Sequence, residues 1–176
     1  MNSKNQTQKM VYAAFFLALA LVLPFLTGQI PQFGQMLLPM HLPVVLCGFL
    51  CGWPWGLAVG AVAPILRSSI FGMPVMFPMA TAMAFELAAK GAACGALYQK
   101  MPKKTSSIYV TLIAAMVLSR MVYGCAQYLF MALDTGFSGL VALWTASVTT
   151  ALPGIILQLV LVPVIVNALD KRRMHV

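Results

Sequence analysis

Residues 42–71 read LPVVLCGFLCGWPWGLAVGAVAPILRSSIF, and this stretch decides the class of fold. Its only charged residue is Arg67. The first apolar run, 42–53, is too short to cross a bilayer upright, because a spanning helix needs about 20 residues. The Trp-Pro-Trp motif at 53–55 ends that run, since proline removes a backbone donor and tryptophan favours a membrane interface. A second run, 56–71, follows it. The stretch therefore predicts a tight helical hairpin inside a membrane.

The composition of the whole chain extends this interpretation. Of 176 residues, 61% are hydrophobic and 8% are charged, whereas a soluble domain carries about 25% charged residues. A chain of this length has room for six spans with short connections. We therefore expect residues 1–176 to form one membrane domain.

Apolar runs and breaks along the chain predict an all-α integral membrane protein with six helices. Uncharged segments rich in Gly, Gln and Pro separate several of the runs. The expected helices are 9–26, 42–53, 56–71, 79–98, 108–131 and 143–169. The first run is longer than a signal-peptide core and lacks a clear cleavage site, so we expect a retained helix.

The basic residues indicate how the helices are oriented. Eight of the eleven lie in three clusters: Lys4 and Lys9; Lys100, Lys103 and Lys104; and Lys171, Arg172 and Arg173. The predicted outer loops contain none, which is a positive-inside pattern. Both termini are therefore predicted to be cytoplasmic. No basic stripe on a solvated face supports nucleic-acid binding.

Four ionisable residues fall inside predicted spans: Arg67, Glu86, Lys90 and Arg120. Each costs at least about 2.5–3.5 kcal/mol at a helix centre, so each is a functional hypothesis. Glu86 and Lys90 are four residues apart and can pair along one helix. That pairing would leave both arginines without a carboxylate, and the excess positive charge favours an anionic ligand. For Arg67, snorkelling to headgroups is the alternative.

Polar and aromatic residues follow Arg120 at helical spacing and recur in the last predicted helix. The first group is Tyr123, Gly124, Gln127 and Tyr128, and the second is Trp144, Thr145, Ser147 and Thr149. Gln35 and His41 add hydrogen-bond donors near the first outer loop. Interhelical packing and interfacial anchoring are the alternative roles of these residues. The candidate substrate-binding residues are Gln35, His41, Arg67, Glu86, Lys90, Arg120, Tyr123, Gln127 and Trp144.

Small residues recur at a spacing of four, which allows helices in lipid to approach closely. Internal packing is the expected role of the glycine pairs, Gly48 with Gly52, Gly56 with Gly60, and Gly91 with Gly95.

Cys47 and Cys51 share a helix face and are interpreted as small apolar residues. A metal or redox pair is the alternative there, but no His or carboxylate lies at ligand spacing beside them. We therefore predict neither a metal nor a cofactor.

Two strings resemble one protein family: GQMLLPMHLPVVLCGFLCGWPWGLAVGAVAPILRSSIFGMP at 34–74 and FPMATAMAFELAAKGAACGALY at 77–98. They are similar to the substrate-binding (S) components of energy-coupling factor (ECF) transporters. The features that carry the resemblance are an Ala-rich first helix, an LP-x-H-x-P entry to a short hairpin, a GMP loop, and an E-L-x-x-x-G fourth helix. The similarity extends from about residue 13 to residue 170.

The resemblance implies a six-helix subunit that captures a vitamin from outside the cell. In the family this subunit docks on a membrane coupling protein driven by two cytoplasmic ATPases, and it is thought to topple in the bilayer. An Ala-x-x-x-Ala face on the first helix is the family's docking surface, and Ala14 and Ala18 match it. The local sequence is most similar to the pantothenate, folate and riboflavin branch of the family. The cationic interior makes pantothenate the first choice.

Other functions remain as alternatives. The same subunit class could serve riboflavin, folate, a pyridoxine-type vitamin or a queuosine precursor. A stand-alone ion-coupled transporter would be expected to have inverted repeats, and none is convincing. An intramembrane enzyme needs a nucleophile, base or metal constellation, which two His and three acidic residues do not readily supply. We therefore expect no catalysis, and the absence of a P-loop leaves ATP to partners.

Overall fold

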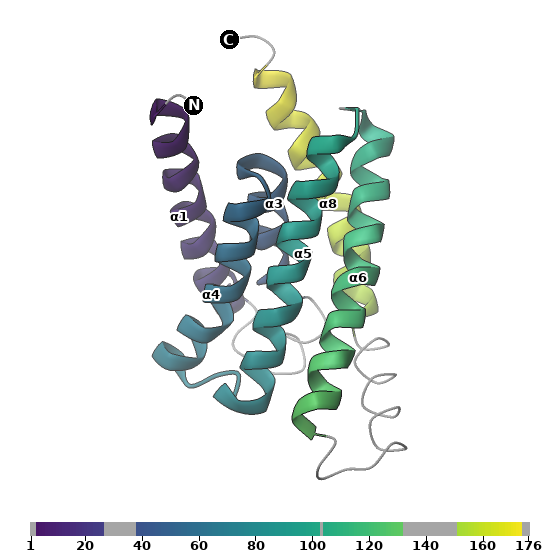
Figure 1. The fold of residues 1–176 in the computed structure, drawn as a ribbon. Coiled ribbons are helices and arrows are strands. Elements are labelled where there is room, and N and C mark those ends of the chain that lie inside the picture. The colour runs from purple at the N-terminus through teal and green to yellow at the C-terminus, as the bar shows by residue number, and fades with distance from the viewer. Residues whose placement is uncertain (1–2, 27–37, 103, 132–150, 174–176) are drawn as a thin grey trace.

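The computed structural model describes residues 3–26, 38–102, 104–131 and 151–173 (Figure 1). All regular elements within these ranges are helical. α1 begins and α8 ends at the same end of the bundle (Figure 1). The elements are α1 (Ser3–Leu26), α3 (His41–Cys51), α4 (Trp53–Phe71), η1 (Met76–Ala80), α5 (Thr81–Lys100), α6 (Thr105–Met131) and α8 (Leu152–Arg173).

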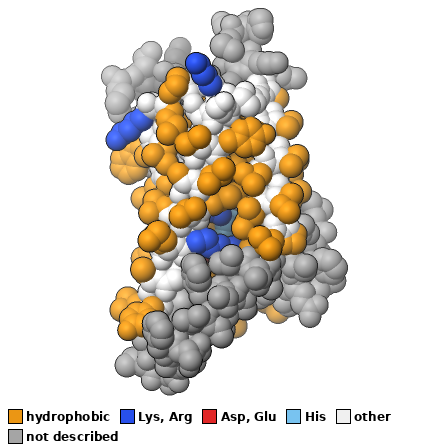
Figure 2. Space-filling view, turned by 90° about the vertical axis from the view of Figure 1, so that its right-hand side faces the viewer, with side chains coloured by type: hydrophobic (Ala, Val, Ile, Leu, Met, Phe, Trp, Pro, Cys, Tyr) orange, Lys and Arg blue, Asp and Glu red, His pale blue; other side chains and the backbone are white. Residues whose placement is uncertain are grey.

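Four helices, α1, α4, α6 and α8, are long and apolar enough to cross a membrane. Their outward side chains are largely aliphatic or aromatic, as a lipid-facing surface requires (Figure 2). α5 is not among the four, because Glu86, Lys90 and its glycines lower its hydropathy. It packs against α3, α4 and α6, which shield it from the surroundings. The predicted all-helical bundle of apolar helices is confirmed.

The predicted hairpin is present, but its turn differs from the expected one. α3 ends at Cys51 and α4 starts at Trp53, so Gly52 alone links them. Gly52 has φ 98° and ψ 175°, a conformation that glycine adopts at no steric cost. The Trp-Pro-Trp motif forms the first turn of α4 rather than the break. Pro54 is tolerated there because the backbone N–H groups in the first turn of a helix have no acceptor within the helix, so proline removes no helical hydrogen bond.

Other helix boundaries shift by a few residues. α1 starts six residues before the predicted residue 9, and α6 starts three residues before the predicted residue 108. A π-type turn, η1, precedes α5, and Thr81 Oγ1 donates a hydrogen bond to Pro78 O at 2.8 Å where they join. For the last predicted helix, α8 covers 152–173, and residues 143–150 lie outside the described part of the chain.

Backbone contacts among glycines hold α3, α4 and α5 together. We call Gly48, Gly56, Gly60, Gly91 and Gly95 the glycine seam. A Cβ atom on Gly48 or on Gly56 would lie 2.5 Å from Gly91 O, and one on Gly60 would overlap the carbonyl of Leu87. No flexible side chain could move aside to relieve these contacts. The expected role of the glycine pairs in internal packing is therefore confirmed for this seam.

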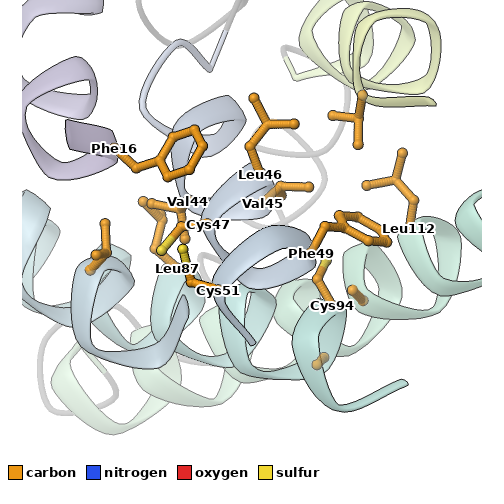
Figure 3. Close-up of a cluster of buried hydrophobic side chains, with 14 of the residues drawn as sticks. Phe16, Val44, Val45, Leu46, Cys47, Phe49, Cys51, Leu87, Cys94 and Leu112 are labelled. Atoms are coloured by element: carbon orange, nitrogen blue, oxygen red, sulfur yellow. The ribbon is translucent and has the colours of Figure 1, made fainter. Parts of the chain in front are cut away.

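α3 lies at the centre of the apolar core. Phe16 of α1, Leu87 and Cys94 of α5, and Leu112 of α6 surround it (Figure 3). Val162 and Val166 of α8 belong to the same buried cluster. Cys47 and Cys51 are buried within it, as small apolar residues are. Within the described residues, no group of three or more potential metal ligands occurs.

Candidate polar substrate site

A cluster of buried ionisable side chains lies where α3, α5 and α6 meet. We call His41, Glu86, Lys90 and Arg120 the polar cluster. His41, Glu86 and Lys90 are each no more than 2% exposed, and the Arg120 side chain is 15% exposed. Blue Lys or Arg and pale-blue His side chains are visible at mid-height, between orange side chains and bordered by residues drawn in grey (Figure 2). Polar side chains are thus visible from this side, within a largely apolar surface.

The depth of the cluster follows from helix geometry. Arg120 lies fifteen residues after the first residue of α6, which at 1.5 Å per residue is about 22 Å along the helix. Glu86 lies fourteen residues before the last residue of α5, or about 21 Å from its end. Since α5 and α6 are joined at that end, the two residues are level. Arg120 therefore lies near the middle of α6, and Glu86 lies level with it, about 8 Å from the first residue of α5.

Glu86 is shared between two neighbouring helices. Its Oε1 atom lies 3.5 Å from Arg120 Nη1 and 3.6 Å from His41 Nε2. These distances allow electrostatic attraction but are too long for good hydrogen bonds. Glu86 Oε1, Arg120 Nη2 and both ring nitrogens of His41 have no hydrogen-bond partner in the structure as described. The cluster thus retains unused donors and acceptors.

This arrangement corrects one sequence-based expectation. Pairing of Glu86 with Lys90 would have left Arg120 without a carboxylate, and this interpretation is wrong. The ion pairs of Glu86 found among the described residues cross to α3 and α6. The reason is tertiary: α5 packs between α3 and α6, so its carboxylate faces other helices. The excess of cations persists, because the polar cluster contains two basic residues, Lys90 and Arg120, and one carboxylate, Glu86.

Arg67 occupies a different environment. It is 6% exposed, and its Nη1 donates a hydrogen bond to Leu21 O of α1 at 3.1 Å. Its guanidinium carbon lies 5.5 Å from the ring centre of Phe25 and 5.7 Å from that of Phe71. These contacts hold Arg67 between α1 and α4, beside Phe25 and Phe71 at the ends of the two helices. A structural role accounts for its burial.

The C-terminal part of α6 contains the remaining described candidates. Gln127 Nε2 donates a hydrogen bond to Tyr123 Oη at 2.7 Å, one turn apart on the same helix. Tyr123 is buried beside Ala82 of α5, whereas Tyr128 is 57% exposed. Tyr123 and Gln127 thus lie one to two turns beyond Arg120. Gln35 and Trp144 lie outside the described residues, as do Thr145, Ser147 and Thr149.

Gln158, a buried polar residue, is not among the candidates predicted from the sequence. Gln158 of α8 is 0% exposed, and neither its amide oxygen nor its amide nitrogen has a hydrogen-bond partner in the described structure. The signal was available, because Gln158 is the only polar side chain in the run LPGIILQLVLVPVIV at 152–166. An uncharged amide in an apolar run is a weaker signal than an arginine, because an uncharged polar group costs less to bury than a charge.

Ala14 and Ala18 are exposed on α1, on the side opposite its buried residues. Ala13, Phe16 and Ala20 form the buried side and contact the core. The two alanines therefore lie on the surface of the described part of the chain. This exposure agrees with a surface available to lipid or to another protein.

Comparisons with known proteins address the class of molecule. A model of the family described as the ECF transporter, substrate-specific component, matches residues 8–166. Searches of curated proteins and of solved structures each found no match. The family match covers α1 to α6 and most of α8. The chain therefore belongs to the family of substrate-specific components of ECF transporters.

Proposed function

We propose that this protein captures an acidic vitamin or a related micronutrient outside the cell for an ECF-type importer. The family match over residues 8–166 supports the transporter class, and members of this family are transporter subunits rather than enzymes. The observation that carries the ligand class is the buried excess of positive charge in the polar cluster. A buried cation without a full counter-charge is costly, and an anionic ligand offsets that cost.

Pantothenate is the first choice of substrate. Its carboxylate would meet Arg120, whose Nη2 atom lacks a hydrogen-bond partner among the described residues. Guanidinium groups bind carboxylates through two parallel hydrogen bonds, which adds geometric selectivity. Riboflavin, folate, a pyridoxine-type vitamin and a queuosine precursor are the alternatives for the same site.

The proposed site consists of His41, Glu86, Lys90 and Arg120, with Tyr123 and Gln127 toward its outer side. Gln35 and Trp144 are proposed to complete it from segments outside the described residues. Glu86 has a positioning role in this arrangement, because it holds both Arg120 and His41. Arg67 is the second candidate for the ligand carboxylate.

Transport requires partners in this proposal. Ala14 and Ala18 would dock on a membrane coupling protein, and two cytoplasmic ATPases would supply the energy. Small residues at a spacing of four permit close helix approach in lipid. The positive-inside pattern supports six spans in a bacterial plasma membrane, with both ends of the chain in the cytoplasm.

Mass spectrometry of small molecules that remain bound through purification tests this function. An acidic vitamin is expected, and a cationic molecule would contradict the ligand class. A pull-down should recover the coupling protein and the ATPases. Uptake by this chain alone in liposomes, driven by an ion gradient, would instead support a self-sufficient transporter.

A further inference from the structure

Gln158 is the most unusual buried residue outside the polar cluster. Its side chain is completely buried, yet the amide oxygen and the amide nitrogen both lack partners in the structure as described. Buried amides are normally hydrogen-bonded, because an unpaired polar group in an apolar environment is costly. An amide that is fully buried and unpaired on both sides therefore indicates a binding role.

The packing of α8 directs Gln158 toward the same interior as the polar cluster. α8 packs against α3 and α6, which provide His41 and Arg120, and α5 packs against α3 and α6 from the other side. The four helices thus form a ring. Gln158, Val162 and Val166 are each 0% exposed and recur every four residues, so they form one inward-facing stripe. Val162 and Val166 belong to the apolar cluster that includes Leu46 and Phe49.

The register of the helices gives the depth of Gln158. Thr105 Oγ1, at the start of α6, lies 3.5 Å from Asn167 Oδ1 of α8. Gln158 lies nine residues before Asn167, which is about 14 Å of helix. Lys90 lies ten residues before Lys100, which is about 15 Å of helix on α5. Gln158 is therefore level with Lys90, on the opposite side of the ring.

We propose that Gln158 is a specificity-determining residue that hydrogen-bonds an amide or lactam group of the substrate. This inference rests on the proposed function. Gln158 Oε1 needs a donor and Nε2 needs an acceptor, and an amide or lactam presents an N–H and a C=O side by side. The substrate class is thus a small acid that also contains an amide or lactam. The acid group faces the cations, and the amide faces α8.

The first test needs no ligand. Replacing Gln158 with Met keeps the size of the side chain and removes the unpaired amide. Gln158→Met should raise the melting temperature of the purified protein without added ligand by about 2–6 °C. A lower melting temperature would overturn the proposal, because it would show that the amide stabilises the fold itself.

The second test uses a matched pair of probes, pantothenate and the ester in which oxygen replaces its amide N–H. Calorimetry on the wild-type protein should show preference for the amide by roughly tenfold to a hundredfold, the value of one buried hydrogen bond. Gln158→Met should bind both probes with similar affinity. The control, Asn167→Leu on the inner part of α8, should keep the wild-type preference. An unchanged preference in Gln158→Met would overturn the proposal.

The outcomes separate this inference from the proposed function. If Arg120→Gln weakens binding and Gln158→Met does not, the acidic-ligand proposal stands and the role of Gln158 fails. If wild-type protein binds neither probe, pantothenate is not the substrate. The molecule identified by mass spectrometry must then contain an amide or lactam, and Gln158→Met must reduce its retention. A retained molecule without such a group would overturn the inference.

Discussion

Two faces of α5 pack in opposite ways. On one face, Gly91 and Gly95 pack backbone against backbone with α3 and α4, and the Leu87 carbonyl packs in the same way against Gly60. On the other face, Glu86 and Lys90 are buried among cationic and polar groups from other helices. The glycine face has no room for even one carbon atom, whereas the face that holds Glu86 retains unused hydrogen-bonding groups.

This difference indicates that α5 has both a packing role and a proposed binding role. Close glycine contacts gain dispersion energy and fix the relative positions of α3, α4 and α5. The polar cluster contributes less to stability, because buried charges lose hydration that weak pairing does not restore. The glycine seam therefore positions the helices, and the polar cluster remains available for a ligand. Four predictions test this distinction, from the largest expected effect to the smallest.

The largest effect is expected in the glycine seam. Gly56→Leu should destabilise the protein by at least about 3 kcal/mol, because its side chain must displace the backbone of α5. Yield of monodisperse protein in detergent and the melting temperature measure this effect. The control is Ala58→Leu, two residues along α4, which is exposed and should be tolerated. A Gly56→Leu protein as stable as that control would refute the structural role of the seam.

The next effect concerns ligand affinity. A charge-assisted hydrogen bond contributes about 1.5–3 kcal/mol, so Arg120→Gln should weaken binding by roughly tenfold to a hundredfold with little change in folding. Arg120→Lys should restore only part of the affinity, because lysine lacks the planar fork. Calorimetry measures both variants, with exposed Met121→Leu as the control. Equal affinity for Arg120→Gln would return Arg120 to a structural role and make Arg67 the next candidate.

The third effect concerns Ala14 and Ala18, the small residues exposed on α1, in contrast to the buried glycine seam. Replacing both Ala14 and Ala18 with Trp should reduce uptake by the reconstituted complex severalfold and leave ligand affinity intact. The reason is that the proposed docking face needs close approach of a helix of the coupling protein. Val117→Trp, exposed on α6, provides a control for added bulk. Uptake at the wild-type rate with both tryptophans present would remove the docking assignment.

The smallest effect is expected at Arg67. Arg67→Met should lower the free energy of unfolding by about 1–2 kcal/mol, because it loses the hydrogen bond to Leu21 O and the contacts with two aromatic rings. Ligand affinity should stay close to the wild-type value. Paired melting and calorimetry experiments measure the two quantities. A large loss of affinity with unchanged stability would instead assign Arg67 to the ligand.

The sequence by itself determined the class of molecule and the approximate helices. Long apolar runs with few charges require membrane spans, and the Trp-Pro-Trp motif predicted a break near residue 53. The turn itself is at Gly52, and only the structure showed that. The apolar runs and the motif are local features, so they are visible in a single sequence. The same is true of Arg120 and Glu86, because any charge in an apolar run stands out. That the whole chain is one membrane domain stays a prediction.

Only the tertiary structure decided which buried groups meet. Local spacing favoured Glu86 with Lys90, but packing of α5 between α3 and α6 brings Glu86 to Arg120 and His41 instead. The tertiary structure also placed the two arginines in different environments. Arg67 is held against α1, whereas Arg120 belongs to the polar cluster. The same packing identifies Gln158 as a candidate binding residue, because an amide is costly only when neighbouring helices bury it without a hydrogen-bond partner. Contacts between distant helices depend on how they cross, and local sequence patterns do not encode that geometry.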